Sequence, residues 1–137
     1  MAHPATAGRH ERPRAFYQGL TGALVDHAKA DLHLNQKQSD GKTLREHLQA
    51  VEQSTGRRPP ELDVPELPDE CIGVWGLFVE LNNLRSEGFG PAIIDEARLC
   101  HWQQLHGIRL NPWEIEAIFA IDRAWREGLA ESRDVAC

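Results

Sequence analysis

The sequence predicts an all-α protein, a small helical bundle of about five helices with a Pro-rich extended linker. Apolar residues recur at helical spacing in most segments, and no segment shows convincing strand alternation. Helix-start signals precede these segments, and Gly or Pro follows several of them. Four prolines in the twelve residues 57–68 predict an extended segment instead of an α-helix there. At 137 residues the chain is one domain, or one domain with an arm.

Residues 1–14 mix Pro, Gly, His and Arg without apolar periodicity, so we expect a disordered basic arm. Residues 15–34 carry apolar side chains at helical spacing. Gly19 and Gly22 each cost about 1 kcal/mol relative to Ala in a helix interior. We therefore expect a helix that is weak alone and becomes stable on packing.

A second helix is expected after a polar connector. Thr43 and Glu46 have the spacing of a capping box, and Gly56 supplies a C-terminal stop. The Pro-rich segment 57–68 must be extended, either as a spacer or as a strap across a helical body. These elements form an N-terminal unit over residues 15–68.

A C-terminal helical body is expected over residues 69–137. Its first segment, 69–86, is the most apolar of the chain, and its length favours a helix over a strand. Asp69 is the expected N-cap of this helix. Gly73 and Gly76 are three residues apart, a spacing that lets another helix approach closely.

A Gly-Phe-Gly-Pro run at 88–91 then breaks the chain, and we expect Phe89 to hold this loop on the core. Asp95 is the expected cap of the next helix, and Gly107 its end. The side chains expected to face inward from this helix are Ala97, Cys100, His101 and Leu105.

The last helix has the strongest start signals in the chain. Asn111 is a good N-cap, Pro112 suits the first helical position, and Glu114 can reach back to the cap. Apolar residues follow helical spacing over 113–129, and we expect the tail 131–137 to fray.

Asp122 is a charged residue at a position of the apolar stripe on this last helix. A carboxylate is rarely buried without a partner. We therefore expect Asp122 at the edge of the stripe, paired with Arg98, Arg123 or Arg126.

The charge is unevenly distributed along the chain. Residues 1–60 hold nine Lys or Arg and six Asp or Glu, whereas residues 61–137 hold six and fifteen, giving the net charge of −6. An acidic second part is a poor match to a nucleic acid backbone. No apolar run approaches 18 residues and no signal peptide is recognisable, so we expect a soluble, non-secreted protein without a membrane partner.

Catalytic and metal-binding patterns are missing from the sequence. Cys100, His101 and His106 are close, but no CxxC or HxxxH pair gives a common zinc spacing. There is no G-x-S-x-G and no Walker loop, and Glu114 and Glu116 diverge on a helix. We predict no enzyme, no metal and no cofactor.

The helices expected over 95–107 and 111–129 are similar to a helix-turn-helix. The first turns of the second helix offer Trp113 and Glu114, with no Lys, Arg, Asn or Gln placed to read bases. A small helix-turn-helix regulator is therefore kept only as an alternative, and no nucleic acid partner is predicted.

Recognition of another protein by helices remains as the leading class. Tryptophan is enriched at interaction hot spots, and this small chain has four. Trp75 and Trp125 are expected mainly in the core. For Trp102 and Trp113, near helix flanks and ends, contact with a partner and packing in the core are equally expected. The candidate protein-binding residues are Trp102, Trp113, Trp75, Phe89 and Trp125.

Several segments also resemble a known family. The GFGP run at 88–91, WQQLHG at 102–107, LNPWEI at 110–115 and IDRAW at 121–125 look like a small family encoded in the tail gene clusters of tailed bacteriophages. The segment 43–68 resembles it as well, so the likeness spans about residues 40–130.

This resemblance implies a non-enzymatic tail assembly chaperone in the host bacterial cytoplasm. Such a protein would bind tape measure or tail tube subunits before the tail polymerises. A structural tail or head-completion protein retained in the virion is a second alternative, and the sequence leaves open whether the chain forms a homo-oligomer.

Overall fold

The computed structural model describes residues 13–84 and 93–136, with side chains described as far as residue 131. Within these residues the chain forms five α-helices and one short 3₁₀ helix, and no strand. The elements are α2 (Arg14–Leu34), α3 (Leu44–Thr55), η1 (Pro60–Leu62), α4 (Asp69–Asn83), α5 (Glu96–His106) and α6 (Pro112–Ala136). The predicted small all-α bundle is confirmed.

Local capping signals set several helix ends where the sequence predicts them. At the start of α3, the Thr43 side chain accepts from the Glu46 N–H at 3.2 Å, and Glu46 accepts from the Thr43 N–H at 3.0 Å. The Asp95 carboxylate caps α5 through the Arg98 N–H at 2.8 Å. Gly56 and Gly107 end their helices with φ of 74° and 63°, a left-handed conformation that suits Gly.

Helix α6 begins at Pro112 as predicted, and the Glu114 carboxylate accepts from the Asn111 backbone N–H at 2.8 Å. Its end differs from the prediction, because the helix continues to Ala136. The expected fraying is therefore wrong for residues 131–136. The sequence after Gly128 holds no Gly or Pro that would stop a helix.

The start of α4 also differs by one position. Pro68 occupies the N-cap and Asp69 is the first helical residue, so the predicted Asp69 cap is wrong. The Cys71 N–H is bonded to the Pro68 carbonyl at 2.9 Å, which begins the helix without a side-chain cap. Asp69 and Glu70 instead lie in the first turn, where negative charge favours the helix dipole.

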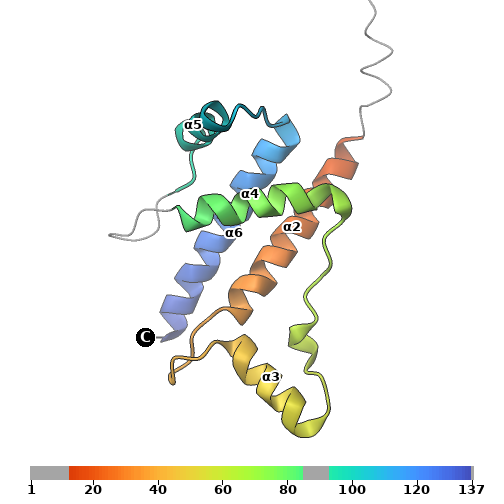
Figure 1. Ribbon diagram of the computed structural model, residues 1–137, viewed down its shortest axis with the longest axis vertical. Coiled ribbons are helices and arrows are strands. Elements are labelled where there is room, and N and C mark those ends of the chain that lie inside the picture. The colour runs from red at the N-terminus through yellow and green to blue at the C-terminus, as the bar shows by residue number, and fades with distance from the viewer. Residues whose placement is uncertain (1–12, 85–92, 137) are drawn as a thin grey trace, which may run out of the picture.

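Helices α2 and α6 lie side by side and run in the same direction, and α4 crosses them both (Figure 1). Near their starts, Tyr17 stacks on Trp113 with ring centroids 5.5 Å apart. Near their ends, Leu32 lies over Gly128, where a Cβ would meet its Cδ2 at 2.5 Å. Both pairs have the same separation in sequence, as two parallel helices require. Gly128 thus permits a close approach of α6 to α2.

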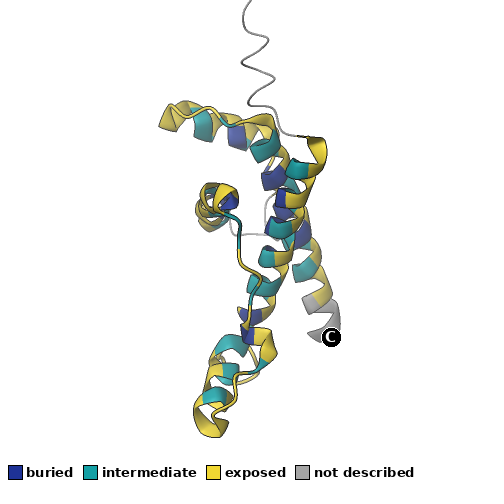
Figure 2. Cartoon of the chain, turned by 90° about the vertical axis from the view of Figure 1, so that its right-hand side faces the viewer, coloured by how far each residue is buried: buried dark blue, intermediate teal, exposed yellow. Residues whose placement is uncertain are grey.

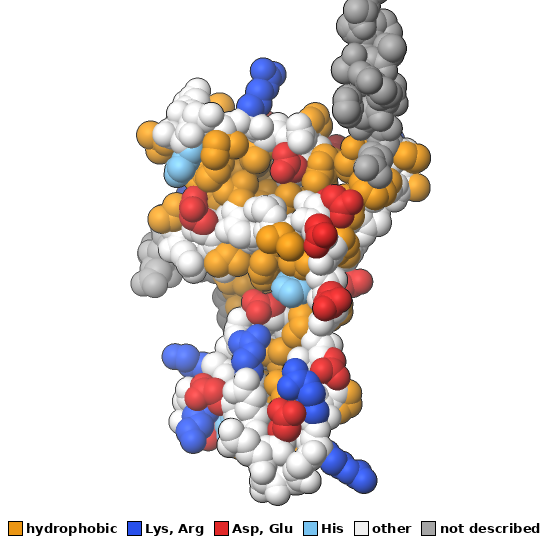
Figure 3. Space-filling view, turned by 45° about the vertical axis from the view of Figure 1, so that its right-hand side comes forward, with side chains coloured by type: hydrophobic (Ala, Val, Ile, Leu, Met, Phe, Trp, Pro, Cys, Tyr) orange, Lys and Arg blue, Asp and Glu red, His pale blue; other side chains and the backbone are white. Residues whose placement is uncertain are grey.

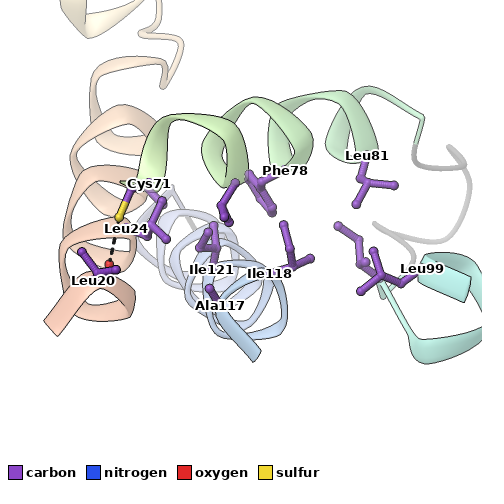
Figure 4. Close-up of a cluster of buried hydrophobic side chains, with 12 residues drawn as sticks. Leu20, Leu24, Cys71, Phe78, Leu81, Leu99, Ala117, Ile118 and Ile121 are labelled. Atoms are coloured by element: carbon purple, nitrogen blue, oxygen red, sulfur yellow. Dashed lines mark hydrogen bonds between the residues drawn. The ribbon is translucent and has the colours of Figure 1, made fainter. Parts of the chain in front are cut away.

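The core lies where α2, α4 and α6 face one another, and α5 closes one end of it (Figures 2 and 4). Its buried side chains are Leu20, Leu24, Ala28, Cys71, Val74, Phe78, Leu81, Ile94, Leu99, Ala117, Ile118 and Ile121. Helix α2 therefore contributes to the same core as α4 and α6. The predicted division into 15–68 and 69–137 stays a prediction, and the arm predicted at 1–14 lies almost wholly outside the described residues.

The Pro-rich segment returns the chain along α2 to the start of α4 (Figure 1). The His27 ring nitrogen Nδ1 donates to the Pro65 carbonyl at 2.9 Å, and its ring meets the Trp75 ring edge-on at 4.7 Å. Leu62 is buried within η1. Helix α3 carries no buried residue and extends away from the core.

Candidate protein-binding surface

The described tryptophans are all half-buried against the core, and each joins elements. Trp75 on α4 stacks on Phe78 with centroids 5.6 Å apart and also meets His27. Trp113 joins the starts of α6 and α2 through its stack on Tyr17. Trp125 packs against the core from α6. Each of these tryptophans therefore packs on the core and is also partly exposed to solvent.

Trp102 connects α5 to α4. Its indole Nε1–H donates to a carboxylate oxygen of Glu80, and its ring is stacked on His106 with centroids 4.2 Å apart. His106 Nδ1 donates to the Trp102 carbonyl at 2.9 Å, so the stack is also held from the backbone.

The four indoles are not gathered into one site. Trp75 is part of α4 and Trp102 contacts α4 through Glu80, whereas Trp113 and Trp125 are about three turns apart on α6. Phe89, the fifth candidate, lies outside the described residues. Partner contact at these five positions stays a prediction.

The orientation predicted for α5 is wrong. Leu99 is buried and Trp102 is half-buried, whereas Ala97, Cys100 and His101 are exposed. Leu105, expected inside, is 84% exposed. Apolar residues occur on every side of this short helix, so periodicity alone does not identify the side that faces the core.

Exposed large hydrophobic residues concentrate on one stretch of the chain. Of the seven in the described residues, six lie between residues 72 and 108 and only Val51 lies elsewhere, on α3. The six are Ile72, Val79, Leu84, Ile93, Leu105 and Ile108. Of these, Ile72 and Val79 lie two turns apart on the same side of α4, and exposed apolar side chains that share a face are typical of interaction sites. Sequence reasoning did not select these residues, although the strongly apolar composition of 69–84 was a usable signal.

The segment that leads into α4, together with α4 itself, is acidic. Between residues 59 and 84 the sequence contains six Asp or Glu and no Lys or Arg. In the space-filling view, hydrophobic and acidic side chains cover the half of the molecule that contains α4 (Figure 3). Basic side chains gather toward the α3 end, apart from one at the opposite edge. The surface therefore favours a partner that is apolar and basic.

Asp122 is a buried acidic residue of α6 that makes polar contacts in this half of the molecule. Its carboxylate is 1% exposed and lies 2.9 Å from the Nε of Arg126. It also accepts from the Ile94 N–H at 3.4 Å, which connects α6 to the segment before α5. The predicted pairing with Arg126 is confirmed, but the predicted position at the edge of the stripe is wrong. The carboxylate is buried because an arginine and a backbone amide both reach it.

Residues suited to other chemistry do not come together in the described parts of the chain. No group of three or more His, Cys, Asp or Glu there could hold a metal ion. None of the helices described is long and apolar enough to cross a membrane. Helix α6, the recognition helix of the helix-turn-helix alternative, has Ala117, Ile118 and Ile121 buried in the core, and its exposed side includes Glu116 and Glu127.

Comparison with known proteins agrees with this picture. No curated protein and no solved structure matches the chain. A family model described as phage tail assembly chaperone matches residues 51–127, more than half of the sequence. The match runs from the second half of α3 through α4 and α5 into α6, and so includes the whole apolar stretch and the acidic segment 59–84. The chain belongs to the phage tail assembly chaperone family.

Proposed function

We propose that this chain binds tape measure or tail tube subunits in the host bacterial cytoplasm and keeps them apart until the tail polymerises. The observation that supports this most is the exposure of six large hydrophobic residues between Ile72 and Ile108, in the part of the chain that the family match covers. A surface of this kind covers apolar segments that would otherwise associate prematurely.

The half-buried tryptophans extend this surface. Trp75 on α4 and Trp102 next to it, with Trp113 and Trp125 on α6, would supply aromatic contacts, and Phe89 is a further predicted contact. Tryptophan buries a large area on binding and loses little conformational freedom, so a few such residues supply much of the binding energy. Binding and release need no nucleotide or catalytic step, which agrees with the sequence prediction that the protein is not an enzyme.

Co-purification from phage-producing cells tests the proposal. The tagged chain is recovered before lysis, the bound proteins are identified by mass spectrometry, and purified virions are probed for the chain. Recovery with the tape measure or tail tube protein and absence from virions is the expected result. A fixed number of copies in virions would instead indicate a structural component, and recovery of neither tail protein would refute the proposal.

Two matched variants test whether tail subunits bind through the exposed hydrophobic residues between 72 and 108. Leu105→Ser removes an 84% exposed hydrophobic residue, and Val51→Ser removes one that is 46% exposed on α3. Both side chains are exposed and lie outside the core, so each substitution should change stability by about 0.5 kcal/mol or less. Recovery of tail subunits should fall with Leu105→Ser and stay at the wild-type level with Val51→Ser.

A further inference from the structure

Helix α4 is apolar on two opposite sides. One side enters the core through Cys71, Val74, Phe78 and Leu81. The other side, which we name the α4 outer face, consists of Ile72, Gly73, Gly76 and Val79 and is exposed. Ile72 is 59% and Val79 39% accessible to solvent. Exposed apolar residues on the side of a helix that faces away from the core are typical of a surface that meets a partner.

The two glycines of this face leave space for a backbone. A Cβ added to Gly73 or Gly76 would meet no other atom within 4 Å. Each glycine nevertheless costs the helix about 1 kcal/mol relative to Ala. Their small size is thus not required by any packing among the described residues, whereas a helix lying across α4 would use it for close approach.

Helix α2 provides the contrast. Gly22 is also exposed, and a Cβ there would also meet nothing within 4 Å. Its neighbours one turn away on the same side are Gln18 and Asp26. That side of α2 is therefore polar and can stay in contact with water. Glycine alone therefore does not distinguish α4; the exposed Ile72 and Val79 beside the glycines do.

The acidic residues around the α4 outer face indicate that its binding partner is basic. Glu66, Asp69 and Glu70 are exposed at the end of the face where α4 begins, and Glu80 lies near its other end. No Lys or Arg occurs between residues 59 and 84 to neutralise them. A helix with Lys or Arg beside its apolar ridge would complement this rim. A second copy docked through the same face would bring carboxylates against carboxylates, which disfavours self-association there.

We propose that the α4 outer face binds an amphipathic helix of a tail subunit, with its apolar ridge across Gly76 and basic residues facing Asp69 and Glu70. This proposal rests on the proposed function. It adds the face to which the tail subunit binds and the type of segment that the subunit contributes. The mode is that of a helix laid on an apolar helical surface, with neighbouring charges setting its direction.

Photo-cross-linking in phage-producing cells identifies the occupant. A photoreactive amino acid replaces Ile72 in the full chain, and the same group at exposed Gln49 on α3 serves as the control. The expected product at position 72 is a cross-link to a helix of the tape measure or tail tube protein that carries Lys or Arg beside its apolar positions. A cross-link to a second copy of this chain, or to a tail segment without basic residues, would overturn the proposal.

Two sets of substitutions then measure the contact with the identified tail subunit. Gly76→Gln places a side chain where the partner backbone would lie, and Gly22→Gln is the matched control on α2. The dissociation constant should rise on the order of tenfold for Gly76→Gln, and stay unchanged for the control. Asp69→Asn with Glu70→Gln should also weaken binding and reduce its dependence on salt.

The outcomes separate the two proposals. If wild-type chain recovers the tail subunit but Gly76→Gln binds it equally well, the α4 outer face is not the site and the proposed function stands. If wild-type chain recovers no tail subunit, the proposed function itself fails. Circular dichroism of each variant, expected to match the wild type, excludes loss of folding as the cause of weaker binding.

Discussion

Arg126 lies one helical turn after Asp122 on α6 and places its Nε 2.9 Å from the buried carboxylate. The same carboxylate accepts from the Ile94 N–H, so a single acidic side chain connects α6 with the segment that leads into α5. This contact holds the segment before α5 against α6, and Leu99 and Trp102 hold α5 itself against the core.

Removal of one partner of this pair should destabilise the fold. Asp122→Ala leaves the Ile94 amide and Arg126 without their acceptor, and we expect a loss of about 3 kcal/mol in the free energy of unfolding. Arg126→Ala should cost less, about 1–2 kcal/mol, because Arg126 is partly exposed and Asp122 keeps the Ile94 bond. Urea unfolding followed by circular dichroism measures both. A larger loss for Arg126→Ala would contradict this assignment.

Acid should weaken the contact between Asp40 and His47. A hydrogen bond of 3.0 Å from His47 is the main cause that holds the pKa of Asp40 below its ordinary value of 3.8. Because the folded-state pKa is lowered, this stabilisation is present above pH 3.8 and is lost as the pH falls through the lowered value. The acid dependence of unfolding should therefore be shallower in Asp40→Asn than in wild type. Equal slopes in the two proteins would show that the contact has no effect.

The described cysteines should differ in reactivity. Burial raises the pKa of the Cys71 thiol, whose Sγ lies 3.5 Å from the Leu20 carbonyl, whereas Cys100 is exposed. In a Cys137→Ser background, a thiol reagent at pH 8 should modify Cys100 rapidly and Cys71 only after addition of urea. Rapid modification of both in the folded protein would mean that α2 and α4 separate readily. Because the folded-state pKa of Cys71 is raised, its ionisation should also weaken the fold above about pH 9.

Two helical glycines should respond differently to alanine. At Gly76 a Cβ meets open space, so Gly76→Ala should raise the free energy of unfolding by about 1 kcal/mol. At Gly128 the Cβ would come within 2.5 Å of Leu32 Cδ2, so that side chain must turn away and the gain should be smaller or absent. Thermal unfolding of the two variants beside wild type provides the comparison. An equal gain at both positions would mean that α2 and α6 are less closely packed than described.

Part of the proposed interface could be predicted from the sequence, and part could not. The spacing of Gly73 and Gly76 indicates a face for close approach, and the structure leaves open space over both. The exposure of Ile72 and Leu105 was not predicted, because exposure depends on which neighbours cover a side chain. The position of α5 was predicted with the wrong side inward for the same reason.

Local residue patterns were enough to predict where most helices begin and end, and the same residues carry the likeness to the family. The Thr43–Glu46 capping box and the Gly56 and Gly107 stops depend on residues within about one turn, so their hydrogen bonds can be read from local spacing. The parallel arrangement of α2 and α6, the burial of Asp122 and the exposure of the α4 outer face became known from the packing of the helices. These features join segments far apart in the chain, and local periodicity records which residues prefer burial but not which partners bury them.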